Sequence, residues 1–169
     1  ERGGCLMSEF KTNAMRLLDR AKIPYTTAEY EHEEGVCVDG VTVAGLIGLE
    51  PECVFKTLVT RGASRSYFVF VIPVAEELDL KKAAKAVGEK SVEMIRVSEI
   101  NAVTGYIRGG CSPVGMKKKY KTVFHSSALE REKIAVSAGK IGHQILVSPR
   151  DLISFTDASV SDIVRDCSE

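Results

Sequence analysis

The chain has 169 residues, enough for one domain with a substantial core, and its 44% hydrophobic and 27% charged content is ordinary for a globular protein. Its 23 basic and 23 acidic side chains cancel, so any contact with nucleic acid has to be a local patch rather than a global field. Five scattered cysteines without a Cys-x-x-Cys pair, and the lack of any run of about 18 apolar residues, argue against a disulfide scaffold and a membrane-spanning protein and favour reduced thiols in the cytoplasm.

The first residues carry no apolar segment of the kind found in signal peptides. We therefore expect residues 1–7 to be a loose tail or a cloning remnant, followed by a single domain over residues 8–166. Ser8 is a suitable cap for a first helix, whose apolar residues recur at helical spacing until Pro24 ends it.

The rest of the chain alternates strand-like and helix-like patterns irregularly. β-Branched residues on both sides of a turn at 62–66 predict a hairpin of two strands, and Asp79 and Gly88 mark the ends of a helix. The other expected elements are strands over 25–32 and 91–95 and near 122–124, 133–136 and 144–147, a polar turn over 33–40, and helices over 41–49, from Ser98 and from Ser148. The last ten residues are expected to fray or pack weakly. This order favours a mixed, partly closed sheet in one α/β domain over a doubly wound parallel sheet.

A glycine-rich segment over residues 105–115 is the most informative local feature. Gly109 and Gly110 allow positive φ and a close approach to a ligand, and Pro113 stiffens the loop. Such a loop presents main-chain N–H groups, and the basic residues that follow it indicate a phosphate-bearing ligand. Those basic residues are Lys117, Lys118, Lys119 and Lys121. An ordinary connection with a solvated lysine tail explains the same pattern equally well.

Motifs for conventional catalysis are incomplete. The segment around Cys111 resembles a nucleophile elbow but has Val114 in place of the final glycine. A zinc deaminase pattern at His32 and Cys53 lacks its second metal-binding cysteine, and the three histidines are far apart. Cys37 and Cys111 are expected to be small hydrophobic residues rather than nucleophiles. The sequence thus predicts a site with no conventional nucleophile, metal or cofactor.

Lys56 is an ionisable residue in a strand whose neighbours are nearly all apolar. Its side chain either extends to the surface or opens into a pocket, where the ammonium would anchor a phosphate or a polarised carbonyl. Tyr30 on the preceding strand can add a hydroxyl, and the turn at 137–142 adds a hydroxyl and a second amine. Together with the glycine loop, these groups would suit an anionic or ester-bearing ligand.

Six blocks, in the same order along the chain, resemble the YbaK/EbsC-type aminoacyl-tRNA deacylases, relatives of the editing domain inserted in bacterial prolyl-tRNA synthetase. The blocks are Val54-Phe55-Lys56-Thr57-Leu58, Leu80-Lys81-Lys82-Ala83-Ala84-Lys85, Val92-Glu93-Met94, Thr104-Gly105-Tyr106, Gly109-Gly110-Cys111-Ser112-Pro113-Val114-Gly115 and Val136-Ser137-Ala138-Gly139-Lys140. The resemblance covers about residues 14–164. It implies a single α/β (α+β) domain with a mixed, barrel-like sheet surrounded by helices, which hydrolyses mischarged tRNA, typically Cys-tRNA(Pro).

The resemblance also implies roles for individual residues. The family's essential lysine falls on Lys56, and the other two groups assigned to catalysis fall on Gly109 and Ser137. Its substrate-binding positions fall on Tyr30, Thr57, Gly110, Ser112, Pro113, Gly139 and Gln144. Two departures concern selectivity: Ala138 replaces a glycine found in many members, and Gln144 replaces a pocket aspartate. The segment 33–41 matches the family poorly.

Three functions remain open from the sequence. The first is a trans-editing Cys-tRNA(Pro) deacylase that works by attack of the substrate's own thiol or of water. The second is a deacylase of the same fold for another small amino acid such as alanine, and the third is a non-catalytic module that binds tRNA or a synthetase. The expected partners are the acceptor end of an aminoacylated tRNA and prolyl-tRNA synthetase, without DNA or membrane, for a monomer or weak homodimer.

Overall fold

The structure of the chain is a computed structural model that describes residues 10–166. The expected tail at 1–7 and the expected cap Ser8 lie outside the described residues. The first helix within the described residues, α2 (Asn13–Arg20), begins later than the apolar spacing predicts, because Thr12 caps it and accepts a hydrogen bond from the main-chain N of Met15 at 3.2 Å.

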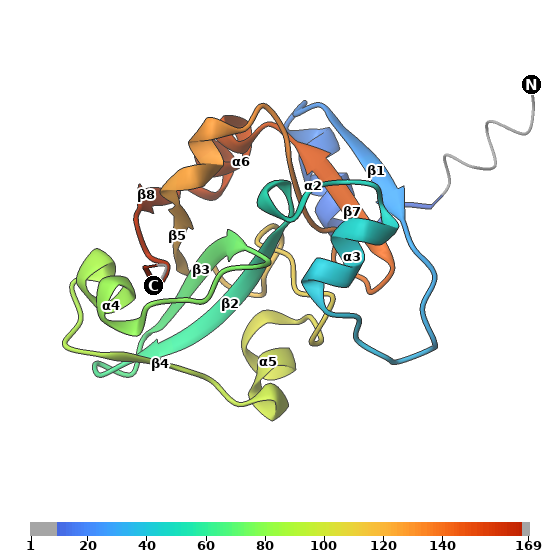
Figure 1. Cartoon of the computed structure of the whole chain (residues 1–169). Helices are drawn as coiled ribbons and strands as arrows, with labels where there is room; N and C mark the ends of the chain where they lie inside the picture. Colours follow the sequence, from blue (N-terminus) through green and yellow to red (C-terminus); the bar gives the residue numbers. More distant parts are fainter. Residues whose placement is uncertain (1–9, 167–169) are drawn as a thin grey trace, which may run out of the picture.

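Two β-sheets form the centre of the molecule, with helices around them (Figure 1). The five-stranded sheet has the order β4-β2-β3-β5-β8 and the three-stranded sheet the order β1-β7-β6. The strands are β1 (Tyr25–Glu29), β2 (Phe55–Gly62), β3 (Tyr67–Pro73), β4 (Val92–Met94), β5 (Lys121–His125), β6 (Ile134–Ser137), β7 (His143–Val147) and β8 (Ser159–Ser161). The other helices are α3 (Gly40–Leu46), α4 (Leu80–Val87), α5 (Val97–Thr104) and α6 (Pro149–Thr156), with short 3₁₀ segments η1 (Pro51–Cys53) and η2 (Ser126–Glu130).

The five-stranded sheet is mixed, as expected. β2 and β3 form the predicted antiparallel hairpin, in which Lys56 is opposite Ile72 and Thr57 opposite Val71. β3 then pairs in parallel with β5, and β5 in parallel with β8. The three-stranded sheet is antiparallel throughout. One parallel bridge, between Val54 and Ala135, joins the two sheets. The predicted mixed α+β fold is therefore confirmed, but its strands form two sheets joined by one bridge rather than the single partly closed sheet that the sequence predicts.

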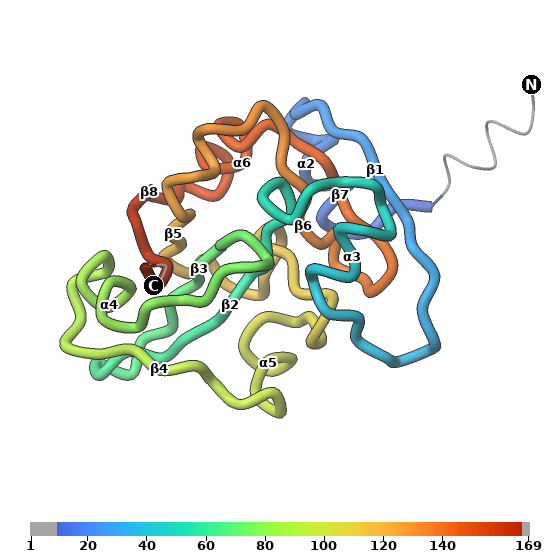
Figure 2. Tube along the Cα trace, in the orientation of Figure 1, coloured from blue at the N-terminus to red at the C-terminus, as the bar shows by residue number. Residues whose placement is uncertain are grey.

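The two faces of the five-stranded sheet pack against different elements. On one face, Val69, Val71 and Phe124 are fully buried with residues of α2, α6 and the three-stranded sheet. On the other face, Phe70 and Ile72 are fully buried with residues of α4. The path of the chain around these two cores can be followed in Figure 2. Among residues 10–166, no helix is both long enough and apolar enough to cross a bilayer.

The expectation that the last ten residues fray or pack weakly is wrong for those that the structure describes. β8 extends the sheet at its edge, and Ile163 is fully buried among Phe70 and Leu78. Lys82 donates from Nζ to the main-chain oxygen of Val164 at 2.8 Å. The short polar segment Ser159–Ser161 carries no strand pattern by itself, so its pairing depends on contacts made in the folded chain.

Candidate functional site

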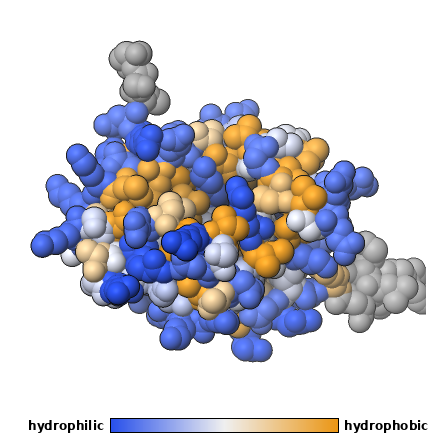
Figure 3. Space-filling model, turned by 90° about the horizontal axis from the view of Figure 1, so that it is seen from below, coloured by the Kyte–Doolittle hydropathy of each residue, from blue (hydrophilic) through white to orange (hydrophobic). Residues whose placement is uncertain are grey.

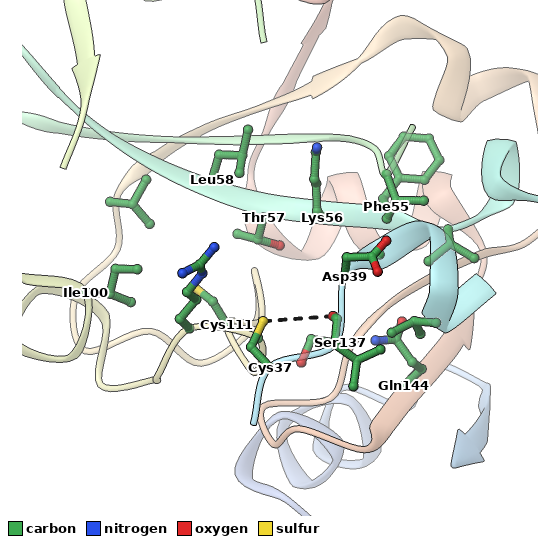
Figure 4. Close-up of a pocket in the computed structure, with 18 of the residues that line it drawn as sticks. Cys37, Asp39, Phe55, Lys56, Thr57, Leu58, Ile100, Cys111, Ser137 and Gln144 are labelled. Carbon is green, nitrogen blue, oxygen red and sulfur yellow. Dashed lines mark hydrogen bonds between the residues drawn. The ribbon is translucent and has the colours of Figure 1, made fainter. Parts of the chain in front are cut away.

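A cleft of about 490 Å³ opens where the two sheets separate beyond the bridge at Val54 and Ala135. It is lined by β2, β6 and β7, by the segment between β1 and α3, by the start of α5 and by the glycine-rich loop (Figure 4). β4 pairs only with residues 60–62 of β2, so residues 55–58 form an open edge of the sheet. The face of the molecule that carries α5 presents apolar patches with hydrophilic positions between them (Figure 3). The volume is in the usual range for a small-ligand site.

Main-chain groups of β2 and β6 are directed into this cleft. In β2, the main-chain oxygen of Val59 accepts a hydrogen bond from the main-chain N of Ile95, so Val59 directs its main-chain groups toward the side of β2 on which β4 lies. Alternate residues of a strand direct their N–H and C=O groups to the same side. Thr57, two residues earlier, therefore offers its main-chain groups there. In β6, Ala138 donates to His143, so the neighbouring Ser137 directs its main-chain groups away from β7. The cleft thus has donors and acceptors on both sides.

Two side chains in the cleft carry buried polar atoms without a partner. Thr57 Oγ1 and Gln144 Oε1 are both buried, and neither has a hydrogen-bond partner within the described residues. Gln144 is only 6% exposed, and its Oε1 in particular is shielded from bulk solvent. Such an unsatisfied buried group typically costs about 1–3 kcal/mol. Ser137, also nearly buried, differs because its Oγ accepts a hydrogen bond from the main-chain N of Gly139 at 3.2 Å. Thr57 and Gln144 are therefore the side chains best placed to receive a ligand.

Lys56 lines the same cleft but from the other face of β2. Because Lys56 is opposite Ile72 and Thr57 opposite Val71, the two side chains leave the strand on opposite faces. Figure 4 shows Lys56 and Leu58 on one side of β2, and Thr57 on the side of Cys37, Ser137 and Gln144. One cleft can include both faces because this part of β2 is an edge. Lys56 therefore lies at the rim rather than on the floor with the glycine loop.

The ammonium of Lys56 is partly desolvated. Burial lowers the pKa of Lys56, while the carboxylates of Glu77 and Glu76 act in the opposite direction. The lysine makes no ion pair within 4 Å among the described residues. A half-buried cation without a close partner at the rim of a cleft is suited to bind an anion.

Tyr30 and Gly109 also line the cleft, as expected. Tyr30 is nearly buried, and its main-chain N donates to Gly142 at 3.0 Å, which ties the end of β1 to the turn before β7. Gly109 has a φ of +88°, and a Cβ there would lie 2.9 Å from Sγ of Cys37. The glycine is therefore required both by its backbone conformation and by the approach of Cys37.

Four expected substrate-binding residues lie behind the cleft wall. Gly110, whose φ is not positive, packs against Lys140 and Ile141, and Gly139 packs against the ring of Tyr106. Ser112 and Pro113 are buried, and Ser112 Oγ accepts from the main-chain N of Val114 at 3.2 Å. None of the four is among the residues that line the cleft. Their positions indicate that they hold the glycine loop and the turn at 137–142 together.

Tyr106 connects these two segments. Its hydroxyl donates to the main-chain oxygen of Val114 at 2.5 Å, while its ring covers Gly139. Burial raises the pKa of Tyr106 to about 12, so the hydroxyl stays protonated and remains a donor at neutral pH. In the sequence, Tyr106 stands out only as a member of one of the blocks that resemble the family.

The cleft is also lined by Cys37 and Cys111, which the sequence indicates to be small hydrophobic residues, and by Arg108, which the sequence reasoning does not single out. Cys37 is exposed, so the expectation that it is a small hydrophobic residue is wrong. Cys111 is partly buried, and burial raises its pKa to about 11, so its thiol is neutral at physiological pH. Arg108 directly precedes Gly109 in the loop, a position that sequence reasoning could have used.

The four lysines after the loop do not line the cleft. Lys117 donates from Nζ to the main-chain oxygen of Ala102 at 3.2 Å, and Lys119 pairs with Asp157 at 3.4 Å. All four lysines are exposed, and Lys118 and Lys121 take part in none of the side-chain hydrogen bonds or ion pairs found among residues 10–166. Across residues 10–166, no group of three or more His, Cys, Asp or Glu side chains is arranged to hold a metal ion.

Comparisons with known proteins agree with this fold and cleft. Two solved structures share the fold: one described as hypothetical protein APE2540, with a TM-score of 0.79 and 23% identity over 89% of this chain and 97% of its own. The other carries the provisional description of a trans-editing enzyme for prolyl tRNA synthetase, with a TM-score of 0.77 and 21% identity over 94% of this chain and 100% of its own. At such low identity, these likenesses show the fold alone.

Sequence similarity is more specific. The aminoacyl-tRNA editing domain family matches residues 38–155, which include Lys56, Gly109 and Gln144. A protein of Enterococcus faecalis with the provisional name Cys-tRNA(Pro)/Cys-tRNA(Cys) deacylase EbsC is 46% identical over 153 residues, or 90% of this chain and 93% of its own. The chain belongs to the aminoacyl-tRNA editing domain family. The predicted family, and with it the class of enzyme that acts on aminoacyl-tRNA esters, is confirmed.

Proposed function

We propose that this protein is a trans-editing deacylase that hydrolyses the ester between a mischarged amino acid and the 3′ end of tRNA, with Cys-tRNA(Pro) as the preferred substrate. The observation that carries the proposal is the cleft, which combines two orphaned polar side chains, two open strand edges and a desolvated lysine. The name of the 46% identical relative supports cysteine as the amino acid.

The orphaned groups suit the amino-acid end of such a substrate. Thr57 Oγ1 and Gln144 Oε1 can accept hydrogen bonds from its α-ammonium group, and so can the main-chain oxygen of Ser137. Gln144 is neutral, so it accepts from the protonated and the neutral amine alike. Lys56 at the rim anchors a phosphate or polarises the ester carbonyl, and main-chain N–H groups at Thr57 and Gly109 hold the ester.

The chemistry needs positioning more than a protein nucleophile, because aminoacyl esters are already reactive. In a cysteinyl ester, the thiol sulfur attacks its own carbonyl carbon and the ribose oxygen leaves with the thiol proton. The resulting four-membered thiolactone then takes up water to give free cysteine. Any other amino acid requires direct attack by water at the carbonyl. Cysteine should therefore react faster than alanine, although both fit the same site.

The experiment compares the deacylation of Cys-tRNA(Pro), Ala-tRNA(Pro) and Pro-tRNA(Pro) by the wild type, by Lys56→Ala and by Lys85→Ala. Lys85 is exposed on α4 and does not line the cleft, so it is a matched control. We expect the wild type and Lys85→Ala to release cysteine well above the rate in buffer, and Lys56→Ala to lose most of this activity. Faster release of alanine than of cysteine would favour the alanine deacylase. Salt-sensitive tRNA binding without any release of amino acid would favour the binding module.

The exposed lysines are proposed to contact the acceptor stem. Replacement of Lys118 and Lys121 by alanine should weaken tRNA binding and reduce its salt dependence, whereas cleavage of a short aminoacyl-nucleotide should not change. Prolyl-tRNA synthetase is proposed as the partner that presents the tRNA in the cytoplasm. Co-migration of the two proteins on size exclusion, with and without tRNA, tests that association.

A further inference from the structure

Arg108 is a cation in the cleft without an assigned partner. It lines the cleft next to Gly109, yet it takes part in none of the ion pairs or side-chain hydrogen bonds found among residues 10–166. Arg108 differs from the four lysines that follow the loop because it lines the cleft and they do not; two of those lysines, Lys117 and Lys119, also donate to protein oxygens. The guanidinium of Arg108 therefore has its N–H donors available to a ligand.

The charge balance of the cleft points in the same direction. Lys56, Arg108 and Asp39 are the charged residues that line it, which leaves one net positive charge. Asp39 is occupied by the start of α3, where it accepts hydrogen bonds from Thr42 N at 3.3 Å and from Thr42 Oγ1 at 2.6 Å. It forms no ion pair with Arg108 within 4 Å. No carboxylate of the described cleft thus neutralises the arginine.

The location of Arg108 differs from that of Lys56. Its loop packs on Cys37 through Gly109, and Figure 4 shows Cys37 on the Thr57 side of β2. Lys56 leaves the strand on the opposite side. The side chains of Lys56 and Arg108 therefore start from different sides of β2. Arg108 is also exposed, so a second anionic group of a bound substrate can reach its guanidinium.

We propose, on the basis of the function proposed above, that Arg108 binds the 5′-phosphate of the terminal nucleotide of the substrate. A guanidinium binds a phosphate through two parallel N–H donors, which fixes direction as well as adding affinity. With the α-amine held by Gln144 and Thr57, this contact fixes the opposite end of the aminoacyl-nucleotide. The cleft then binds the substrate at two charged ends, the amine at its inner end and the phosphate at its outer end, and thereby orients the ester between them.

The test uses two stable amide analogues, 3′-cysteinylamino-3′-deoxyadenosine with and without a 5′-phosphate. Their dissociation constants are measured by calorimetry for the wild type, Arg108→Gln, Arg108→Lys and Arg16→Gln. Arg16 is exposed on α2 and does not line the cleft, so it is the control. For the wild type and Arg16→Gln we expect the phosphorylated analogue to bind about 10- to 100-fold more tightly, since the contact is a charge-assisted hydrogen bond.

In Arg108→Gln this ratio should fall to about 1 because the phosphorylated analogue loses its affinity. Arg108→Lys should recover part of it, because an ammonium provides a point charge without the planar pair of donors. A ratio that is the same in Arg108→Gln as in the wild type would overturn the proposal, as would a wild type that does not prefer the phosphate. A failure of the proposed function appears separately, as no wild-type deacylation of Cys-tRNA(Pro) above the rate in buffer.

Discussion

The buried amide of Gln144 allows stability and activity to be separated. Gln144→Met keeps the length of the side chain and removes an Oε1 that is buried without a partner. An unsatisfied group of this kind costs about 1–3 kcal/mol, and methionine also gains apolar burial. Taking the lower part of that range, we expect a stability gain of about 1 kcal/mol. In a chain of 169 residues this raises Tm by about 2–4 °C.

The same substitution should reduce activity. A hydrogen bond to a charged group contributes about 1.5–3 kcal/mol, so losing the contact to the substrate ammonium lowers kcat/KM by about 10- to 150-fold. Thr57→Val removes the second unpartnered oxygen with little change in shape, so it should also raise Tm and lower kcat/KM, both by smaller amounts. Thr26→Val, in an exposed position of β1, is the control and should change neither quantity.

Scanning calorimetry and single-turnover deacylation of Cys-tRNA(Pro) measure the two effects. If Gln144→Met lowers both Tm and activity, the prediction is wrong, because the amide would then stabilise the folded protein rather than serve ligand binding. A higher Tm with unchanged activity would show that the amide is a cost without a role in this reaction.

Three other variants test different parts of the structure. Gly109→Ala places an alanine at φ +88° and against Cys37, so its free energy of unfolding, measured by chemical denaturation, should fall by about 1–2 kcal/mol. Adding Cys37→Ala to this variant should restore only the part of the loss that comes from the contact with Cys37. Lys56→Met should raise Tm by about 1–2 °C at pH 7 while abolishing deacylation. Burial lowers the pKa of Lys56, so between that lowered pKa and the ordinary lysine pKa the unfolded wild type binds more protons than the folded one. The stability of the wild type therefore rises with pH in this range, and the difference in Tm between Lys56→Met and the wild type shrinks. A Tm difference that stays constant with pH would contradict this. Ile163→Ala should lose about 2–5 kcal/mol by urea denaturation, whereas a frayed C-terminus would lose almost nothing.

Local signals in the sequence were sufficient for most of the fold. The β2–β3 hairpin, the Asp79 cap of α4 and the positive-φ Gly88 that ends it all follow from residues close to one another in the chain. β8 could not be predicted in this way, because its three residues become a strand only through pairing with β5, far earlier in the sequence. The same limitation hid the burial of Ile163.

The sequence indicated many of the residues that line the cleft, but not the directions in which their side chains point. Of the residues that sequence and family resemblance selected, six line the cleft, namely Lys56, Thr57, Tyr30, Gly109, Ser137 and Gln144, whereas Gly110, Ser112, Pro113 and Gly139 do not. The sequence and the resemblance did not show that Lys56 and Thr57 lie on opposite faces of an edge strand, since that depends on the register with β3 and on where β4 stops pairing. Cys37 and Arg108 were missed because their exposure to the cleft results from how the loops pack.

The most direct test of the central claim is the alkylation of Cys37 by iodoacetamide at pH 7.5, measured by peptide mass spectrometry with and without the phosphorylated amide analogue. Cys37 is an exposed thiol of the cleft wall, whereas Cys53 lies outside the cleft and serves as an internal control. If the aminoacylated end of tRNA occupies this cleft, saturating analogue should slow the modification of Cys37 at least about 10-fold, as expected for occupancy above 90%, and leave that of Cys53 unchanged. Modification of Cys37 at its original rate, with the analogue bound according to calorimetry, would place the substrate elsewhere on the protein.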